Sequence, residues 1–163
     1  MELLQVFDEN KNMLNESIER ENKKSLTNGK HFMIVLLFIE NEEKKFLIQK
    51  TSVEKQSQFA TTGGHATIGD DSLKTVIKEA QEELGIKFKE DELKFIDTID
   101  HGICFCDIYY TNKKINIEDL KLQDEEVEYI DWYTIDEIEK MKSEGTFRKG
   151  NIVPLEKVLE KTR

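Results

Sequence analysis

The hydrophobic positions of this chain fall into short runs, most of which have the spacing of β-strands. The clearest run, HFMIVLLFIE at residues 31–40, is apolar at consecutive positions and predicts a central strand of a sheet covered on both faces. After the turn NEEK, the run KFLIQK at 45–50 predicts a neighbouring strand that pairs with it as a hairpin. Further strands are predicted at residues 3–8, 93–99, 103–111 and 127–134.

Two other segments lack a strand-like pattern. The polar residues 15–30 predict a connection that leads into the central strand. The segment TTGGHATIGDD at 61–71 predicts a glycine-bearing loop.

Helical spacing begins at Ser72. Apolar residues then recur three and four positions apart, which predicts a helix with one buried face, made of Leu73, Val76, Ile77, Ala80 and Leu84. Gly85 predicts the end of this helix as a C-cap.

Two shorter helices are predicted near the end of the sequence. One covers 134–143, where Thr134 and Glu137 have capping-box spacing, and the other covers 153–161, with a proline in its first turn. Strands flanked by helices before and after predict a mixed β-sheet in an α/β/α sandwich.

Composition narrows the class of protein and its partners. A length of 163 residues, with no low-complexity tract, predicts a single domain over 1–163. The net charge of −10 argues against a nucleic acid polymer as partner, because such binding depends on clustered Lys and Arg. A small phosphorylated ligand remains compatible if the site supplies its own positive charge.

Localisation and cysteine chemistry give weaker signals. The beginning of the chain has neither a basic leader nor a long apolar stretch, and the most apolar run, 33–39, is too short to span a bilayer. We therefore expect a cytoplasmic protein that does not bind membranes. Cys104 and Cys106 alternate along a predicted strand, and we expect both to be buried thiols rather than zinc ligands.

The predicted helix at 72–84 carries three glutamates on the side opposite its apolar face. Glu79, Glu82 and Glu83 are three and four positions apart, where like charges cost about 0.2–0.5 kcal/mol per pair. A solvated surface can absorb that cost, so an exposed acidic face is the ordinary interpretation. The adjacent Gly63 and Gly64 upstream, however, let backbone oxygens approach a ligand. Carboxylate and carbonyl oxygens together predict a site for Mg²⁺ or Mn²⁺.

At these residues the chain resembles the Nudix hydrolase family, whose signature is G-x5-E-x7-R-E-U-x-E-E-x-G-U, where U is apolar. Seven of the nine specified positions hold the expected residue type, from Gly64 to Ile86. Asp70 replaces the first Glu of the signature, and Lys78 replaces its Arg. The resemblance extends more loosely over most of the chain and implies a Nudix-like α/β/α sandwich.

The resemblance also implies an activity. Nudix enzymes hydrolyse the pyrophosphate linkage of a nucleoside diphosphate joined to another moiety, by attack of water on phosphorus. It implies that Glu79, Glu82 and Glu83 are metal ligands together with the carbonyl of Gly64, and that the cofactor is Mg²⁺ or Mn²⁺. Glu82 or Glu83 is the first choice for the catalytic proton acceptor. Second candidates, in the segment before the last strand, are Glu125 and Glu126.

Two alternatives stay open at this stage. The segment around His31 and His65 also resembles the isopentenyl-diphosphate-isomerase-like branch, but Gly63 stands where those enzymes have a cysteine, and their catalytic glutamates have no counterpart. The changes at Asp70 and Lys78 are compatible with a module that senses a nucleotide without cleaving it.

Other candidate ligand-binding residues have weaker support. Lys78 and Arg20 are possible phosphate ligands, although exposed basic side chains are usually only solvated. Aromatic residues at 59, 132 and 133 are possible stacking partners for a base, although core positions are the ordinary interpretation for Phe59, Trp132 and Tyr133. His31 and His65 are expected to be hydrogen-bonded rather than metal-bound, and His101 carries no signal of its own. The sequence is compatible with a monomer or a homodimer.

Overall fold

The computed structural model of the protein describes residues 2–53, 56–123 and 127–163. In chain order its strands and helices are β1 (Leu3–Phe7), β2 (Met13–Glu19), β3 (Phe32–Ile39), β4 (Phe46–Thr51), β5 (Phe59–Ala60), β6 (Thr62–His65), α1 (Ser72–Leu84), β7 (Lys94–Asp100), β8 (Cys104–Thr111), β9 (Val127–Tyr133), α2 (Ile135–Ser143) and α3 (Ile152–Thr162). Short 3₁₀ segments include Arg20–Ser25 and Lys149–Asn151.

The central sheet is mixed, as predicted. Its strand order is β6-β3-β8-β7, in which β3 and β8 are parallel and the other neighbours are antiparallel. The strands β5, β4 and β9 form a second antiparallel sheet, and β1 and β2 form a two-stranded ribbon. The central position predicted for β3 is confirmed.

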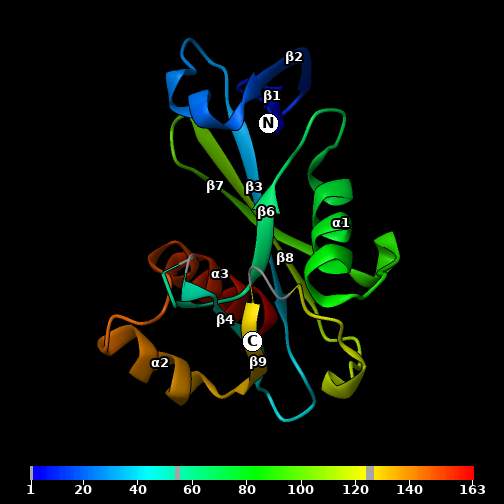
Figure 1. The fold of residues 1–163 in the computed structure, drawn as a ribbon, viewed down its shortest axis with the longest axis vertical. Helices are drawn as coiled ribbons and strands as arrows, with labels where there is room; N and C mark the ends of the chain where they lie inside the picture. The colour runs from blue at the N-terminus through cyan, green and yellow to red at the C-terminus, as the bar shows by residue number, and fades with distance from the viewer. Residues whose placement is uncertain (1, 54–55, 124–126) are drawn as a thin grey trace.

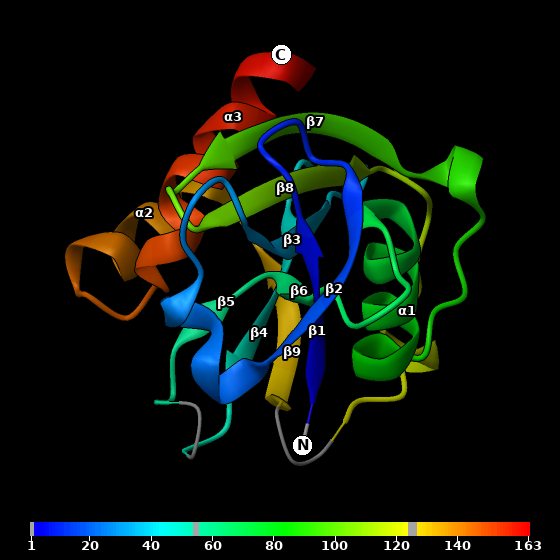
Figure 2. The same ribbon diagram turned by 90° about the horizontal axis from the view of Figure 1, so that it is seen from above.

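Alternate side chains of β3 pack into two different hydrophobic layers. Those of one face join α1, in a cluster that includes Met33, Val35, Leu37, Val76, Ala80 and Leu84. Those of the other face join α2 and α3, in a cluster that includes Leu36, Phe38, Ile138, Met141, Leu155 and Val158. Both views accordingly place α1 on one side of the central strands and α2 and α3 on the other (Figure 1, Figure 2). This arrangement is the predicted α/β/α sandwich.

The helix ends follow the predicted chemistry. Asp71 caps α1 by accepting a hydrogen bond from the backbone N–H of Lys74, and Gly85 ends the helix with a left-handed φ of 73°. Thr134 and Glu137 form the predicted capping box of α2.

The predicted hairpin between β3 and β4 is wrong. Both edges of β3 are occupied, by β6 on one side and by β8 on the other, so β4 pairs instead with β5 and β9. A tight turn redirects the chain after β3, because the Asn41 side chain accepts hydrogen bonds from the N–H groups of Glu43 and Lys45. One isolated bridge, between Glu40 and Phe46, joins the two strands.

The polar segment 15–30 contains more regular structure than predicted. It includes most of β2, which pairs with β1. Only Leu14 and Ile18 of this strand pack on a small apolar cluster, so the segment has no continuous hydrophobic run. No helix in the described part of the chain is long and apolar enough to cross a membrane.

Candidate active site

The glycine pair lies in a strand and not in the predicted loop. β6 pairs with β3 so that Gly63 lies opposite Leu36 and Gly64 lies opposite Val35. A Cβ atom at position 63 would collide with the carbonyl oxygen of Val35 and approach the Leu36 side chain to 2.7 Å. At position 64 it would collide with the carboxylate of Glu79. Glycine therefore permits both the close strand pairing and the close approach of α1.

The three glutamates of α1 differ in exposure. Glu79 is half-buried beside Gly64, and Glu82 is exposed. Glu83 is only 5% exposed, although it belongs to the same acidic face. A purely solvated acidic surface therefore does not describe this part of the helix.

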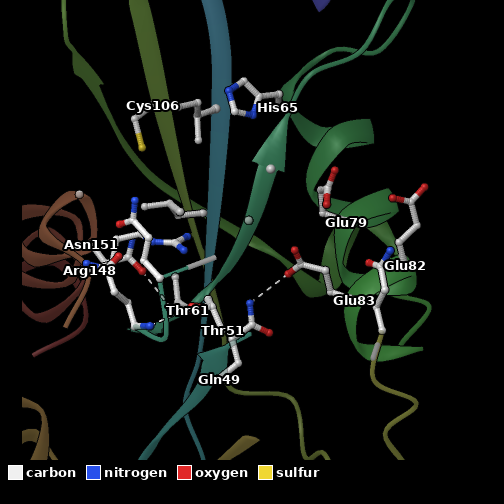
Figure 3. Close-up of a pocket in the computed structure, with 18 of the residues that line it drawn as sticks. Gln49, Thr51, Thr61, His65, Glu79, Glu82, Glu83, Cys106, Arg148 and Asn151 are labelled. Carbon is white, nitrogen blue, oxygen red and sulfur yellow. Dashed lines mark hydrogen bonds between the residues drawn. The ribbon is translucent and has the colours of Figure 1, made fainter. Parts of the chain in front are cut away.

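Buried Glu83 is held by side chains from two sheets. Its Oε1 accepts a hydrogen bond from the hydroxyl of Thr62 on β6. It also accepts one from Nε2 of Gln49 on β4, at 3.3 Å (Figure 3). Hydrogen bonds to a charged group stabilise it by about 1.5–3 kcal/mol each, which offsets part of the cost of burying the carboxylate. The position of Glu83 is thus fixed relative to the glycine strand.

These groups line one pocket of about 680 Å³. The carboxylates of α1 and the glycines of β6 form one side of it. The other side is polar and comes from β4, from the residue between β5 and β6, and from the segment before α3 (Figure 3). Its residues are Gln49, Thr51, Thr61, Arg148, Gly150 and Asn151.

The donor set of the pocket suits a hard divalent cation. The described residues contain no group of three His, Cys, Asp or Glu side chains already arranged around one metal position. Glu79, Glu82 and Glu83 nevertheless line the same pocket as Gly64, and they project from one helical face. Magnesium prefers such oxygen ligands and keeps several waters, so it needs few direct protein contacts. The predicted ligands are brought together in one pocket, and their chemistry fits the ion.

Comparison with known proteins agrees with the signature. A family model described as the NUDIX domain matches residues 30–155. The chain belongs to the Nudix hydrolase family. A protein of Listeria monocytogenes named "Uncharacterized Nudix hydrolase" is 30% identical over 153 residues, covering 90% of this chain and 88% of the relative. The family and the enzyme class predicted from the sequence are confirmed.

Solved structures support the Nudix fold. A Deinococcus radiodurans protein superposes with a TM-score of 0.75 at 18% identity, over 94% of this chain and 96% of that one. The NUDIX domain of Shewanella oneidensis NrtR, in complex with ADP ribose, gives a TM-score of 0.66 at 13% identity, over 90% and 99% of the two chains. Nudix hydrolases generally use divalent cations to cleave nucleoside diphosphate derivatives.

The two residues that depart from the Nudix signature pair with each other outside the pocket. Nζ of Lys78 lies 3.5 Å from Oδ2 of Asp70 and donates a hydrogen bond to the hydroxyl of Thr67 at 3.1 Å. Neither Asp70 nor Lys78 is among the pocket residues, so Lys78 is not placed to bind a phosphate there. The substitutions leave the pocket lining unchanged.

The remaining basic and aromatic candidates have ordinary surroundings. Arg20 lines the pocket, where it pairs with Glu2 at 3.0 Å. Trp132 packs on the core beneath α1, whereas Phe59 and Tyr133 pack on the core beneath α2 and α3. These aromatic residues are partly buried against the core, and none is among the described pocket residues. The second candidates for proton acceptor, 125 and 126, lie outside the described residues.

The histidines have different surroundings. His65 lines the pocket, and its Nε2 lies 2.9 Å from Nζ of Lys23, which confirms the expected hydrogen bond. The His31 ring stacks on the Phe105 ring, with 4.2 Å between the ring centroids. Neither ring nitrogen of His31 has a hydrogen-bond partner in the described structure. The hydrogen bond expected for His31 is therefore wrong, because a hydrophobic contact takes its place. His101 also lines the pocket.

Both cysteines are buried, as predicted. Burial raises the pKa of Cys104 to about 11 and that of Cys106 to about 12. Cys106 lines the pocket from β8, but a thiol with that pKa remains protonated at neutral pH. This cysteine is also far in sequence from Gly63, where the isomerase-like branch has its own.

Several polar residues in and beside the pocket were not predicted from the sequence, among them Thr62, which contacts Glu83. Thr62 adjoins the glycine pair, so its position next to the signature was the one available signal. Gln49, Arg148 and Asn151 come from distant segments without a recognisable motif. Only the pairing of β4, β5 and β6 with their neighbours brings them opposite α1.

Proposed function

We propose that this protein is a metal-dependent hydrolase that cleaves the pyrophosphate linkage of a small nucleoside diphosphate derivative. The observation that carries this proposal is the pocket in which the acidic face of α1 and the bare backbone of Gly64 meet. Family membership supplies the reaction class, and the pocket supplies the residues for it.

The charge of the pocket supports a requirement for cations. Its described lining includes four glutamates, Glu2 among them, and only two arginines. A pyrophosphate group would be repelled by this excess of carboxylates unless cations offset it. Bound Mg²⁺ or Mn²⁺ neutralises phosphate oxygens and lowers the pKa of a coordinated water.

We assign the metal-binding role to Glu79, Glu82 and Glu83 with the carbonyl of Gly64. Either Glu82 or Glu83 accepts the proton of the attacking water, and the hydrogen bonds favour Glu82. Oε1 of Glu83 already accepts hydrogen bonds from Thr62 and Gln49, which fix that carboxylate in place. Glu82 is exposed on the same helical face and can move with the substrate.

A product assay tests the reaction. The protein is incubated with Mg²⁺ and a panel of ADP-ribose, nucleotide sugars, dinucleoside polyphosphates and oxidised nucleoside triphosphates, and the products are separated by ion-exchange chromatography. We expect at least one compound to be cleaved at its pyrophosphate, and chelation of the metal by EDTA to stop the reaction. Binding of a compound without product in Mg²⁺ or Mn²⁺ would instead identify a sensing module.

Substitution of the carboxylates tests the site. Glu82→Gln and Glu83→Gln should each lower kcat by about a hundredfold to ten-thousandfold, the range expected when a proton acceptor is lost. Circular dichroism should show folded proteins in both cases. Glu90→Gln, an exposed glutamate outside the pocket, is the matched control and should keep full turnover. Unchanged rates for Glu82→Gln and Glu83→Gln would place the chemistry elsewhere.

A further inference from the structure

Arg148 lies on the polar side of the pocket, across from the glutamates of α1 (Figure 3). Its backbone is fixed on both sides. The Arg148 N–H donates to the carbonyl of Phe59 at 2.8 Å, and the Arg148 carbonyl accepts from the N–H of Asn151 at 3.0 Å. The Arg148 side chain therefore extends from a backbone position that two hydrogen bonds hold in place, shortly before α3.

The guanidinium of Arg148 is partly buried without a close carboxylate. In the described part of the chain no Asp or Glu oxygen lies within 4.0 Å of it, whereas Arg163 contacts Glu40 at 2.7 Å. Burial lowers the pKa of Arg148, and the more distant charge of Glu83 opposes that effect. An arginine nevertheless stays charged in proteins, so this pocket contains a cation that no carboxylate of the described residues neutralises at close range.

On the same side of the pocket, one buried acceptor atom has no partner among the described residues. Gln49 is 5% exposed, and its Oε1 has no hydrogen-bond partner in the described structure, although its Nε2 donates to Glu83. Buried polar atoms without partners are rare, and an ordered water or an ion commonly satisfies them. Arg148 and Gln49 thus line the same cavity, where Arg148 supplies the hydrogen-bond donors.

We propose that Arg148 binds a phosphate group of the substrate directly, as a substrate-binding residue outside the Nudix signature. This inference rests on the proposed function. The planar guanidinium can donate two parallel hydrogen bonds to phosphate oxygens, and burial strengthens the attraction. The carboxylates of α1 need a cation to hold phosphate, whereas Arg148 does not. The substrate is then held between the acidic helix and the arginine.

Titration with inorganic pyrophosphate in the presence of Mg²⁺ tests this role. Calorimetry should show that Arg148→Gln raises Kd by about tenfold to a hundredfold, the range for one charged hydrogen-bonding group. Arg148→Lys should recover part of the lost affinity, because lysine keeps the positive charge but cannot donate two parallel hydrogen bonds from one planar group. Lys149→Gln is the matched control, since it removes an exposed neighbouring charge outside the pocket, and its Kd should stay within twofold of wild type.

The outcomes separate binding from structural effects. If Arg148→Gln does not fold, Arg148→Lys becomes the test of the inference. This variant should bind pyrophosphate more weakly than wild type at an unchanged Tm. An unchanged Kd, or a wild-type protein that does not bind pyrophosphate, overturns the inference. A lower kcat with unchanged Kd and a shifted pH profile also overturns it, because Arg148 would then act through Glu83. Loss of turnover on the whole substrate panel would refute the hydrolase proposal alone, since the titration does not depend on cleavage.

Discussion

At the scale of single residues, the neighbouring glycines have different physical constraints. A side chain at Gly63 would meet the backbone of Val35, which cannot move without disturbing the central sheet. For a side chain at Gly64, the three nearest atoms belong to the end of the Glu79 side chain, which can swing away. Gly63 is therefore needed for the pairing of β6 with β3, and Gly64 is needed for the position of the Glu79 carboxylate.

Substitution by alanine should separate these two effects. Gly64→Ala should lower kcat/KM at least about tenfold, or ~1.4 kcal/mol of transition-state stabilisation, because it displaces Glu79. Its Tm should change by less than about 3 °C, since less than about 1 kcal/mol is lost. Gly63→Ala should cost about 1–3 kcal/mol of stability through overpacking. Steady-state kinetics and thermal unfolding check both, and a Gly64→Ala protein with full activity would contradict the role given to Glu79.

The residues that the sequence predicts well belong to one continuous segment. The acidic face of α1 and the glycine pair are within 23 residues of each other, so their spacing alone indicates that they meet. Arg148 and Gln49 are about a hundred residues apart. Their shared place in the pocket depends on strand pairing across two sheets, which no local pattern encodes.

At the scale of elements, α1 has a third surface besides its apolar and acidic faces. Lys78 is exposed there and reaches back to Asp70, in the loop that precedes the helix. Such exposed pairs contribute about 0–1 kcal/mol. The Asp70 and Lys78 side chains are therefore a surface connection between helix and loop, and not part of the pocket.

Restoring the signature should therefore change little. The double variant Asp70→Glu with Lys78→Arg should keep kcat/KM within about threefold of wild type, or ~0.7 kcal/mol. Lys78→Met should behave similarly, because it removes no pocket charge. Steady-state kinetics on the same substrate check this expectation. A gain of tenfold or more in the double variant would show that these positions limit catalysis from outside the pocket.

The prediction of strand pairing failed at this scale for a physical reason. β3 and β4 are adjacent apolar runs joined by a short turn, a pattern that favours a hairpin. β3, however, is buried on both faces and pairs along its whole length with β8, in parallel from Phe32 to Ile39. The competition between a local partner and a distant one is decided by the packing of both faces, which periodicity does not describe.

At the scale of the whole molecule, an ion pair between a buried carboxylate and a partly exposed arginine joins the end of β3 to the residue after α3. Glu40 has a side chain that is 1% exposed, and it accepts hydrogen bonds from Arg163 at 2.7 and 3.0 Å and from the Tyr110 hydroxyl at 2.7 Å. Burial raises the pKa of Glu40, but these hydrogen bonds lower it by more, so that it ends below its ordinary value. The charged form of Glu40 is therefore stabilised in the folded protein.

Removal of Arg163 should destabilise the protein in a pH-dependent way. Because the pKa of Glu40 is lower in the folded protein, the pair adds stability above the unfolded pKa of about 4.3, and that stability is lost as pH falls through the folded pKa. Arg163→Gln should cost about 1–3 kcal/mol at pH 7, the cost of leaving a buried carboxylate without its partner. Partial exposure of the arginine, 37%, places the expectation toward the lower end.

Urea unfolding at pH 7, 5 and 3 measures this dependence. The difference in unfolding free energy between wild type and Arg163→Gln should be largest at pH 7 and should shrink below about pH 4.3, since protonation of Glu40 removes the charge that needs the arginine. Lys142→Gln is the matched control, because its partner Glu139 is exposed, and it should change stability by at most about 1 kcal/mol. A pH-independent loss in Arg163→Gln would mean that Arg163 acts by packing near the Phe46 ring, whose centroid lies 6.0 Å away, and not through Glu40.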